Sequence, residues 1–158
     1  MDNNNELFFD LFFKNNGEID LLTGTIAPNQ FNQIVRRDSQ LSDRSNSKLS
    51  IICLNINISK FSILYPSEDM KLALENALIA ANFELSKIFR SSDCICRISQ
   101  IGFWVLVTEV NSDISKKLLK RVAEVLPDYF DIEISHRTKG QSQLDWYSQI
   151  DELHFRSN

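Results

Sequence analysis

Cysteine and histidine are the residues of this sequence best suited to bind a metal ion or act as nucleophiles. There are three cysteines, Cys53, Cys94 and Cys96, and two histidines, His136 and His154. A tetrahedral metal site built on the three thiolates would need one of the histidines as its fourth ligand. All three cysteines instead fall within apolar, strand-like runs, and their odd number does not fit a disulfide framework. We therefore interpret them as buried, reduced thiols and predict no metal site.

The charged residues argue against nucleic acid or a membrane surface as a partner. The formal net charge is −4, so no overall basic field would attract either one. The basic pairs Arg36-Arg37, Lys116-Lys117 and Lys120-Arg121 fit solvated helix faces, one of which can border a binding pocket. The polar start of the chain, residues 1–6, is unlike a signal peptide, and no apolar run is long enough to span a membrane. We expect a cytoplasmic protein without direct membrane insertion.

The scaffold that positions these side chains is predicted to be a single domain in which helices and strands alternate. Of the 158 residues, 43% are hydrophobic, which is enough to build a core. Residues 38–48 are polar and are expected to form a loop. The order of elements predicts an α/β (α+β) fold with a mixed sheet flanked by helices. The pattern predicts strands over 49–58, 94–99, 103–109 and 129–135, helices over 6–14, 68–90, 113–126 and 142–155, and a further helix that begins at Pro28.

Two of these elements carry the clearest patterns. Residues 49–58 are apolar on both faces, as expected of a central strand covered on both sides. Residues 68–90 repeat apolar side chains on one helical face, and Ser67-Glu68-Asp69 provides a cap and an acidic first turn. A tight turn at Gln100-Ile101-Gly102 joins the two strands of the predicted hairpin.

The N-terminal segment is predicted to be an apolar helix with a linker over residues 1–19, ahead of a domain over residues 20–158. Six of the seven residues from Leu7 to Phe13 are apolar, too many for a lone surface helix. The segment is expected to pack on the domain, on a second copy of the chain, or on another protein.

Several local motifs, in this order of elements, resemble the GGDEF family, whose members have the diguanylate cyclase fold. Asp20, Leu22-Thr23-Gly24 and Phe31 match the spacing at which the family opens its domain, although Ala27-Pro28 replaces the usual Asn-Arg. The long helix then leads to Asp93 and Arg97, again spaced as in the family. The resemblance covers residues 20–137. It implies a nucleotidyl cyclase-like central mixed sheet flanked by helices, here with an extra N-terminal helix.

The family signature itself is degenerate in this chain. The hairpin sequence Gly-Gly-Asp-Glu-Phe corresponds here to Ser99, Gln100, Ile101, Gly102 and Phe103. The family joins two GTP molecules into cyclic di-GMP with the help of divalent cations, which prefer carboxylate ligands. The family takes those carboxylates from the hairpin and from the first Asp of the Asp-x-Asp strand end, where this chain has Asn55. The resemblance therefore implies no diguanylate cyclase activity, no catalytic residues and no metal.

The positions that bind the substrate guanine in the family are altered as well. The guanine-binding Asn has no counterpart, because Ile63-Leu64-Tyr65 stands in its place, and either Asp69 or Glu75 lies near the guanine-reading Asp. An alternative metal site from Asn57, Glu68 and Asp69 is disfavoured, since Glu68-Asp69 fits the start of a helix better.

This chain retains the residue spacing of a second family site. Many members carry a product-binding inhibitory motif, Arg-x-x-Asp, five residues before the signature, and Arg90-Ser91-Ser92-Asp93 matches that spacing. A guanidinium fork can bond a phosphate or the O6/N7 edge of guanine, and a carboxylate can accept from guanine N1 and N2. Two such residues do not suffice for tight binding, so either a second arginine from a neighbouring surface or a dimer of the ligand would be needed. As the structural alternative, Arg90 would complement the helix dipole and the Ser-Ser-Asp run would be an ordinary turn.

Three classes of function follow from the resemblance. The first is a receptor in bacterial cyclic di-GMP signalling that uses Arg90 and Asp93, with cyclic di-GMP as its ligand and no cofactor. The second is a ligand-free protein interaction module on the same fold. The third, a surviving nucleotide-binding enzyme, is disfavoured by the missing carboxylates.

Overall fold

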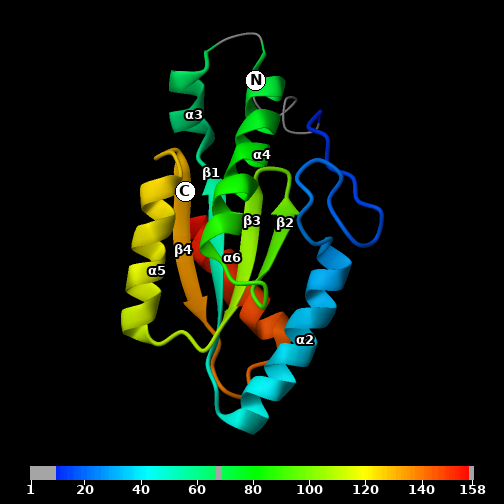
Figure 1. Cartoon of the computed structure of the whole chain (residues 1–158), viewed down its shortest axis with the longest axis vertical. Helices are drawn as coiled ribbons and strands as arrows, with labels where there is room; N and C mark the ends of the chain where they lie inside the picture. The colour runs from blue at the N-terminus through cyan, green and yellow to red at the C-terminus, as the bar shows by residue number, and fades with distance from the viewer. Residues whose placement is uncertain (1–9, 67–68, 157–158) are drawn as a thin grey trace.

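The computed structural model describes residues 10–66 and 69–156, with side chains described up to Glu152. Its four strands form one sheet in the order β2-β3-β1-β4, with β1 at Leu49–Ile56, β2 at Cys94–Ser99, β3 at Gly102–Thr108 and β4 at Phe130–His136. The helices are α2 at Pro28–Ser45, α3 at Ile58–Leu64, α4 at Met70–Ile88, α5 at Ser112–Val125 and α6 at Gln143–Arg156 (Figure 1). The predicted α+β class is confirmed. The sheet is antiparallel throughout rather than mixed, and parallel pairing among the described residues is limited to an isolated bridge between Ile26 and Cys96.

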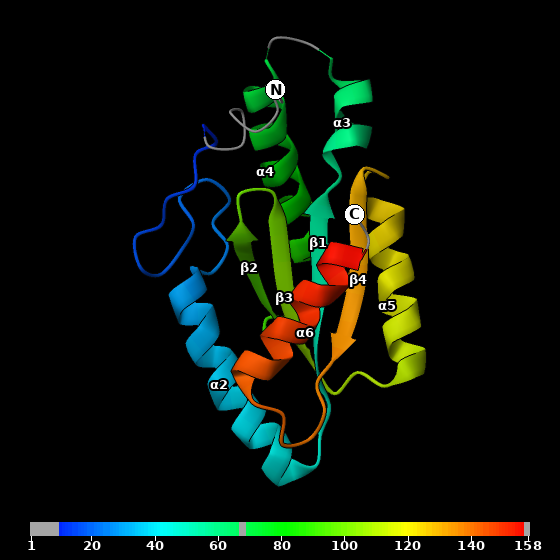
Figure 2. The same ribbon diagram turned by 180° about the vertical axis from the view of Figure 1, so that it is seen from behind.

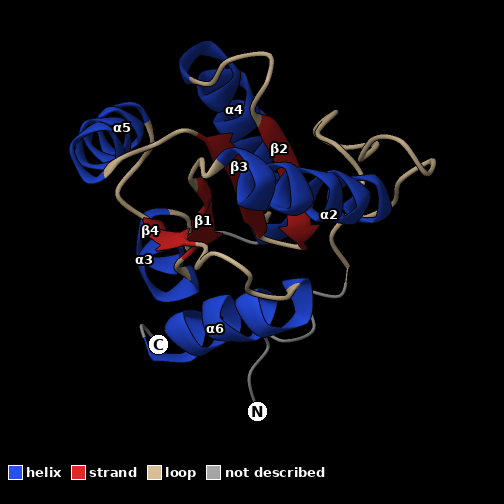
Figure 3. Ribbon diagram, turned by 90° about the horizontal axis from the view of Figure 1, so that it is seen from below, coloured by secondary structure: helices blue, strands red, loops and turns tan. Residues whose placement is uncertain are grey.

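The central strand β1 separates two hydrophobic cores, as its two-sided apolar pattern predicts. Ile52, Leu54 and Ile56 join the core beneath α4 and α5, whereas Ile51 and Cys53 join the core beneath α2 and α6. Figure 3 shows α4 and α5 on one side of the sheet and α6 on the other, and in Figure 2 α6 crosses in front of the sheet. Alternation along a pleated strand sends successive side chains to opposite faces, so β1 anchors both layers.

Helix α2 extends through most of the segment that the sequence predicts to be a loop. It ends at Ser45, where Asn46 adopts a left-handed conformation (φ 57°). The loop prediction over 38–48 is therefore wrong for residues 38–45. Ser39 and Ser42 continue the buried face begun by Phe31 and Val35. Small hydroxyl side chains occupy that face, so the polar composition of the segment hides its helical periodicity.

Two further boundaries differ from those predicted. The strand predicted over 49–58 ends at Ile56, and Asn57 caps the short helix α3 by accepting a hydrogen bond from the backbone N–H of Lys60 (3.1 Å). Helix α4 begins at Met70 with Asp69 as its N-cap residue, and Ser67 and Glu68 of the predicted cap lie outside the described residues. The expected acidic first turn is not found, since the first turn of α4 from Met70 onward contains no acidic residue. The hairpin, α5, β4 and α6 lie where the sequence predicts them.

The predicted N-terminal helix is not found in the part of it that the structure describes. Residues 10–14 form a turn and then irregular chain, while residues 1–9 lie outside the described residues. Leu11 is buried in the core beneath α4, and the backbone N–H of Phe12 donates to Glu75 on α4 (2.9 Å). This part of the segment packs on its own domain. None of the helices in the described ranges is long and apolar enough to cross a membrane.

Candidate ligand-binding site

The tip of the β2–β3 hairpin, which corresponds to the family signature, is closely packed. Gly102 pairs in register with Asn55 on β1 and with Ser99 on β2. A Cβ atom at Gly102 would lie 2.8 Å from Ser99 Oγ, 3.0 Å from Asn55 Oδ1 and 3.1 Å from the carbonyl oxygen of Leu54. An acidic side chain at this position would thus require its neighbours to move. The turn residue Ile101 offers no metal ligand either.

The polar groups beside this hairpin are engaged in structural contacts. Asn57 caps α3 through Oδ1, and its Nδ2 donates to Asp131 on β4 (3.3 Å). Asp131 lies opposite Asn55 in the sheet. Within residues 10–66 and 69–152, no group of three or more histidine, cysteine or acidic side chains could hold a metal ion.

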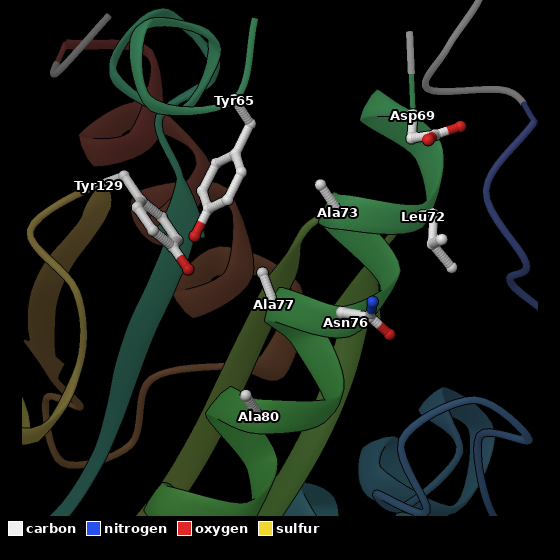
Figure 4. A pocket seen from close by; sticks show the side chains of 8 residues that line it. All are labelled: Tyr65, Asp69, Leu72, Ala73, Asn76, Ala77, Ala80 and Tyr129. Carbon is white, nitrogen blue, oxygen red and sulfur yellow. The ribbon is translucent and has the colours of Figure 1, made fainter. Parts of the chain in front are cut away.

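A hollow of about 420 Å³ between the end of α3 and α4 is lined by Tyr65 and by Asp69, one of the two residues expected near the family's guanine-reading position. Figure 4 shows the rings of Tyr65 and Tyr129 facing the alanines of α4, whereas Leu72 and Asn76 point to the other side. Asp69 is among the lining residues, but none of them is basic. Such a lining offers no positive charge to a triphosphate. Glu75, the other candidate here, instead accepts from Phe12.

Cys53 and Cys96 are buried thiols, as the sequence predicts, whereas Cys94 is less buried than expected. Cys53 and Cys96 flank Trp104 in the sheet and are both free, and burial raises the pKa of each to about 12. Cys94 is half-buried and free as well. His136 lies at the end of β4, where its Nδ1 and the Ser50 hydroxyl share a hydrogen bond (2.7 Å), and the side chain of His154 lies outside the described residues.

The Arg90-Ser91-Ser92-Asp93 motif forms a turn between α4 and β2 that brings its two charged residues together. Asp93 Oδ2 accepts from the backbone N–H of Arg90 (3.0 Å) and, at 3.5 Å, from Arg90 Nε. Arg90 Nη2 donates to the carbonyl oxygen of Thr108 (3.0 Å). These bonds use two of the five guanidinium donors, so three are left for a ligand. Arg90 is largely exposed.

The carboxylate of Asp93 is only half satisfied. The side chain is 5% exposed, and its Oδ1 is buried yet accepts no hydrogen bond from the described residues. A buried acceptor left unpaired costs about 1–3 kcal/mol, a cost that a donor reaching this oxygen would remove. Asp93 and Arg90 together line two hollows, of about 380 Å³ and 250 Å³.

The smaller of these hollows is also lined by a second arginine, which the sequence offers only as part of a basic pair on a helix face. Arg121 of α5 lines it together with Arg90 and Asp93, and its apolar walls come from the ends of α4, β3 and α5. The Lys120-Arg121 pair looks like a solvated helix face in the sequence. Only the packing of α5 beside the end of α4 shows that Arg121 shares a hollow with the motif.

Comparison with known proteins identifies the fold. No protein-family model matches the sequence, and no curated protein matches it. Among solved structures, the GGDEF domain of DgcB from Caulobacter crescentus in complex with cyclic di-GMP is 11% identical, with a TM-score of 0.72 over 91% of each chain. A microbial GGDEF domain described with cyclic di-GMP is 16% identical, with a TM-score of 0.73 over 89% of this chain and 92% of that one.

A third structure shows a similar domain within a larger protein. The diguanylate cyclase SiaD from Pseudomonas aeruginosa, in complex with its activator SiaC, is 16% identical, with a TM-score of 0.67. The match covers 85% of this chain but spans only 54% of SiaD. The described chain thus has the GGDEF-domain fold, the fold of diguanylate cyclases.

Proposed function

We propose that this chain acts in bacterial cyclic di-GMP signalling as a non-catalytic receptor that binds cyclic di-GMP through Arg90 and Asp93. The observation that carries the proposal is the unpaired, buried Oδ1 of Asp93 beside two arginines. Guanine offers N1 and N2 donors to a carboxylate and an O6/N7 edge to a guanidinium. Arg121 supplies the second cation that the two phosphates of the ligand require.

The absence of catalysis is the second part of the proposal. It rests on Asn55, Ile101 and Gly102, which stand where the family has metal-binding carboxylates, and on the crowding around Gly102. An Asn amide neutralises no charge, and the other two residues offer no ligand for a hard cation. A signature hairpin of this composition would neither hold the metal nor activate the ribose hydroxyl.

Calorimetric titration of the full chain with cyclic di-GMP, with GTP as the control ligand, tests this function. We expect heat of binding for cyclic di-GMP and none for GTP. Asp93→Asn should weaken binding, because an amide presents donors where guanine needs an acceptor pair. No heat at high micromolar cyclic di-GMP would refute the receptor function.

A ligand-free interaction module is the second candidate, favoured by the exposed apolar side of α4. Leu72, Ile79 and Phe83 recur at helical spacing and are 56%, 44% and 63% exposed. The partner would be another protein or a second copy of the chain, with the apolar N-terminal segment contributing to the contact. Light scattering on the full chain and on a deletion of residues 1–9 distinguishes the outcomes. A dimer that the deletion abolishes supports this candidate, and a monomer in both cases counts against self-association.

A further inference from the structure

Two arginine–carboxylate pairs flank Cys94. One is the Arg90–Asp93 pair of the motif turn, and the other is Arg37–Asp38 on α2, in which Arg37 Nε lies 3.1 Å from Asp38 Oδ1. Burial raises the pKa of Cys94, Asp38 and Asp93 raise it further, and Arg37 lowers it. Asp93 directly precedes Cys94 in the chain, and Arg37 and Asp38 line the same hollow as Cys94, so both pairs lie near the same thiol.

The second pair lines a hollow of its own, next to the motif turn. This hollow has a volume of about 450 Å³, within the range of small-molecule pockets. Ser91 and Ser92 of the motif form one wall of this hollow. The motif turn therefore separates it from the hollow of about 380 Å³ that Arg90 and Asp93 line. Its apolar surface comes from Leu41, Leu49 and Cys94.

The charges in this hollow fit a nucleobase better than a phosphate. Arg37 and Lys48 carry two positive charges, and Asp38 and Glu109 carry two negative charges, so the lining is neutral overall. A phosphate would meet as many carboxylates as cations there. The Watson–Crick and Hoogsteen edges of guanine, in contrast, need both an acceptor and a forked donor, and the apolar surface suits the faces of the ring.

Glu109 is held in this position at a conformational cost. It has a left-handed backbone (φ 59°), unusual for a residue other than glycine, and its N–H donates to the carbonyl oxygen of Lys48 (2.9 Å). The residue lines both this hollow and the one that contains Arg90 and Arg121. Strained residues of this kind often occur at binding sites.

We propose that the hollow lined by Arg37, Asp38 and Cys94 is a second guanine subsite of the same ligand. One guanine of cyclic di-GMP would bind at Arg90 and Asp93, and another guanine would bind on the far side of the Ser91-Ser92 wall. The inference rests on the proposed function, since it concerns the same ligand and extends its footprint from the motif turn to α2.

Alkylation of Cys94 reports directly on this subsite. The full chain is treated with N-ethylmaleimide at about pH 9, where a fraction of a thiol with a raised pKa is ionised and can react, and the modified peptide is quantified by mass spectrometry. Cys94 lines the hollow and is half-buried, whereas Cys53 and Cys96 are buried. We expect saturating cyclic di-GMP to slow modification of Cys94 several-fold and GTP to leave it unchanged.

Calorimetric titration of the Arg37→Ala and Arg36→Ala variants with cyclic di-GMP completes the test. Arg36 is its exposed neighbour and is not among the residues that line the hollow, so it controls for the loss of one charge on α2. We expect Arg37→Ala to weaken cyclic di-GMP binding about fivefold or more, the lower end of the value of a bidentate guanine contact, and Arg36→Ala to bind like wild type. If wild type binds but Cys94 is not protected and Arg37→Ala binds normally, the subsite is wrong and the receptor function stands. If wild type does not bind cyclic di-GMP at all, both the second subsite and the receptor function are wrong.

Discussion

Arg97 and Asp20 form an ion pair that is sealed inside the protein. Their side chains are 0% and 1% exposed, and Arg97 Nη1 lies 3.4 Å from Asp20 Oδ1. The same guanidinium donates to the carbonyl oxygens of Phe12 and Gln100 and lies over the ring of Phe13. One buried cation thus joins the N-terminal segment, the Leu-Thr-Gly turn and the tip of the signature hairpin.

Asp20→Asn is expected to destabilise the fold strongly. The variant leaves the charge of Arg97 buried without its counter-ion, and removing one partner of a buried pair typically costs about 3–5 kcal/mol. Urea denaturation followed by circular dichroism measures the loss. The matched control is Glu84→Gln, which breaks the exposed pair with Lys87 and should cost about 0–1 kcal/mol. A loss for Asp20→Asn no larger than the control's would show that the pair contributes little.

A second ion pair should make stability depend on pH in the acid range. The side-chain hydrogen bonds from Arg137, with a smaller contribution from the backbone N–H of Gly140, lower the pKa of Asp43 from 3.8 to about 2. A pKa lowered in the folded state adds stability that is fully present above the ordinary value and is lost as pH falls toward the folded value. Wild type should therefore exceed Asp43→Asn in urea stability above pH 4, and the difference should shrink between pH 4 and pH 2. A difference that does not change across this range would contradict the assignment.

The sequence predicts the sheet and the motif turn well, because their signals are local. The two-sided apolar run of β1 and the hairpin around Gly102 lie where periodicity and turn residues place them. The end of α2 is missed because Ser39 and Ser42 are polar in composition yet face the core. Residues 10–14 are missed for the opposite reason, since apolar content alone does not specify a helix.

The sequence predicts only part of the candidate site. Arg90 and Asp93 stand out through their spacing, whereas Arg121 and Arg37 come from helices that approach the turn only after folding. Neither arginine has a local pattern that separates it from a solvated helix face. When a site is assembled from segments far apart in the chain, a single sequence does not show which residues come together there.

The purified chain is expected to make no cyclic di-GMP from GTP with Mg²⁺ or Mn²⁺. Asn55, Ile101 and Gly102 provide no carboxylate to bind the cations that neutralise phosphate charge. Chromatography of overnight reactions, alongside an active diguanylate cyclase as a positive control, checks this. Product above a blank without protein would overturn the assignment of these positions.

Arg121→Ala is expected to weaken cyclic di-GMP binding, and so is Arg90→Ala, by about 1–3 kcal/mol each, the value of one lost bidentate contact. The reason is the shared hollow, which both arginines line together with Asp93, whose Oδ1 is unpaired. Calorimetry measures both losses.

Lys120→Ala is the matched control for Arg121, because it removes a neighbouring exposed charge that is not among the residues lining the hollow. Ile101→Ala should bind like wild type, since the hairpin tip would hold no nucleotide. If Arg90→Ala loses affinity but Arg121→Ala does not, the ligand lies in the hollow between the motif and the Leu-Thr-Gly turn instead, which Arg90 and Asp93 also line. If Ile101→Ala loses as much affinity as Arg90→Ala, the ligand lies at the hairpin, and the transfer of the inhibitory site to this chain is wrong.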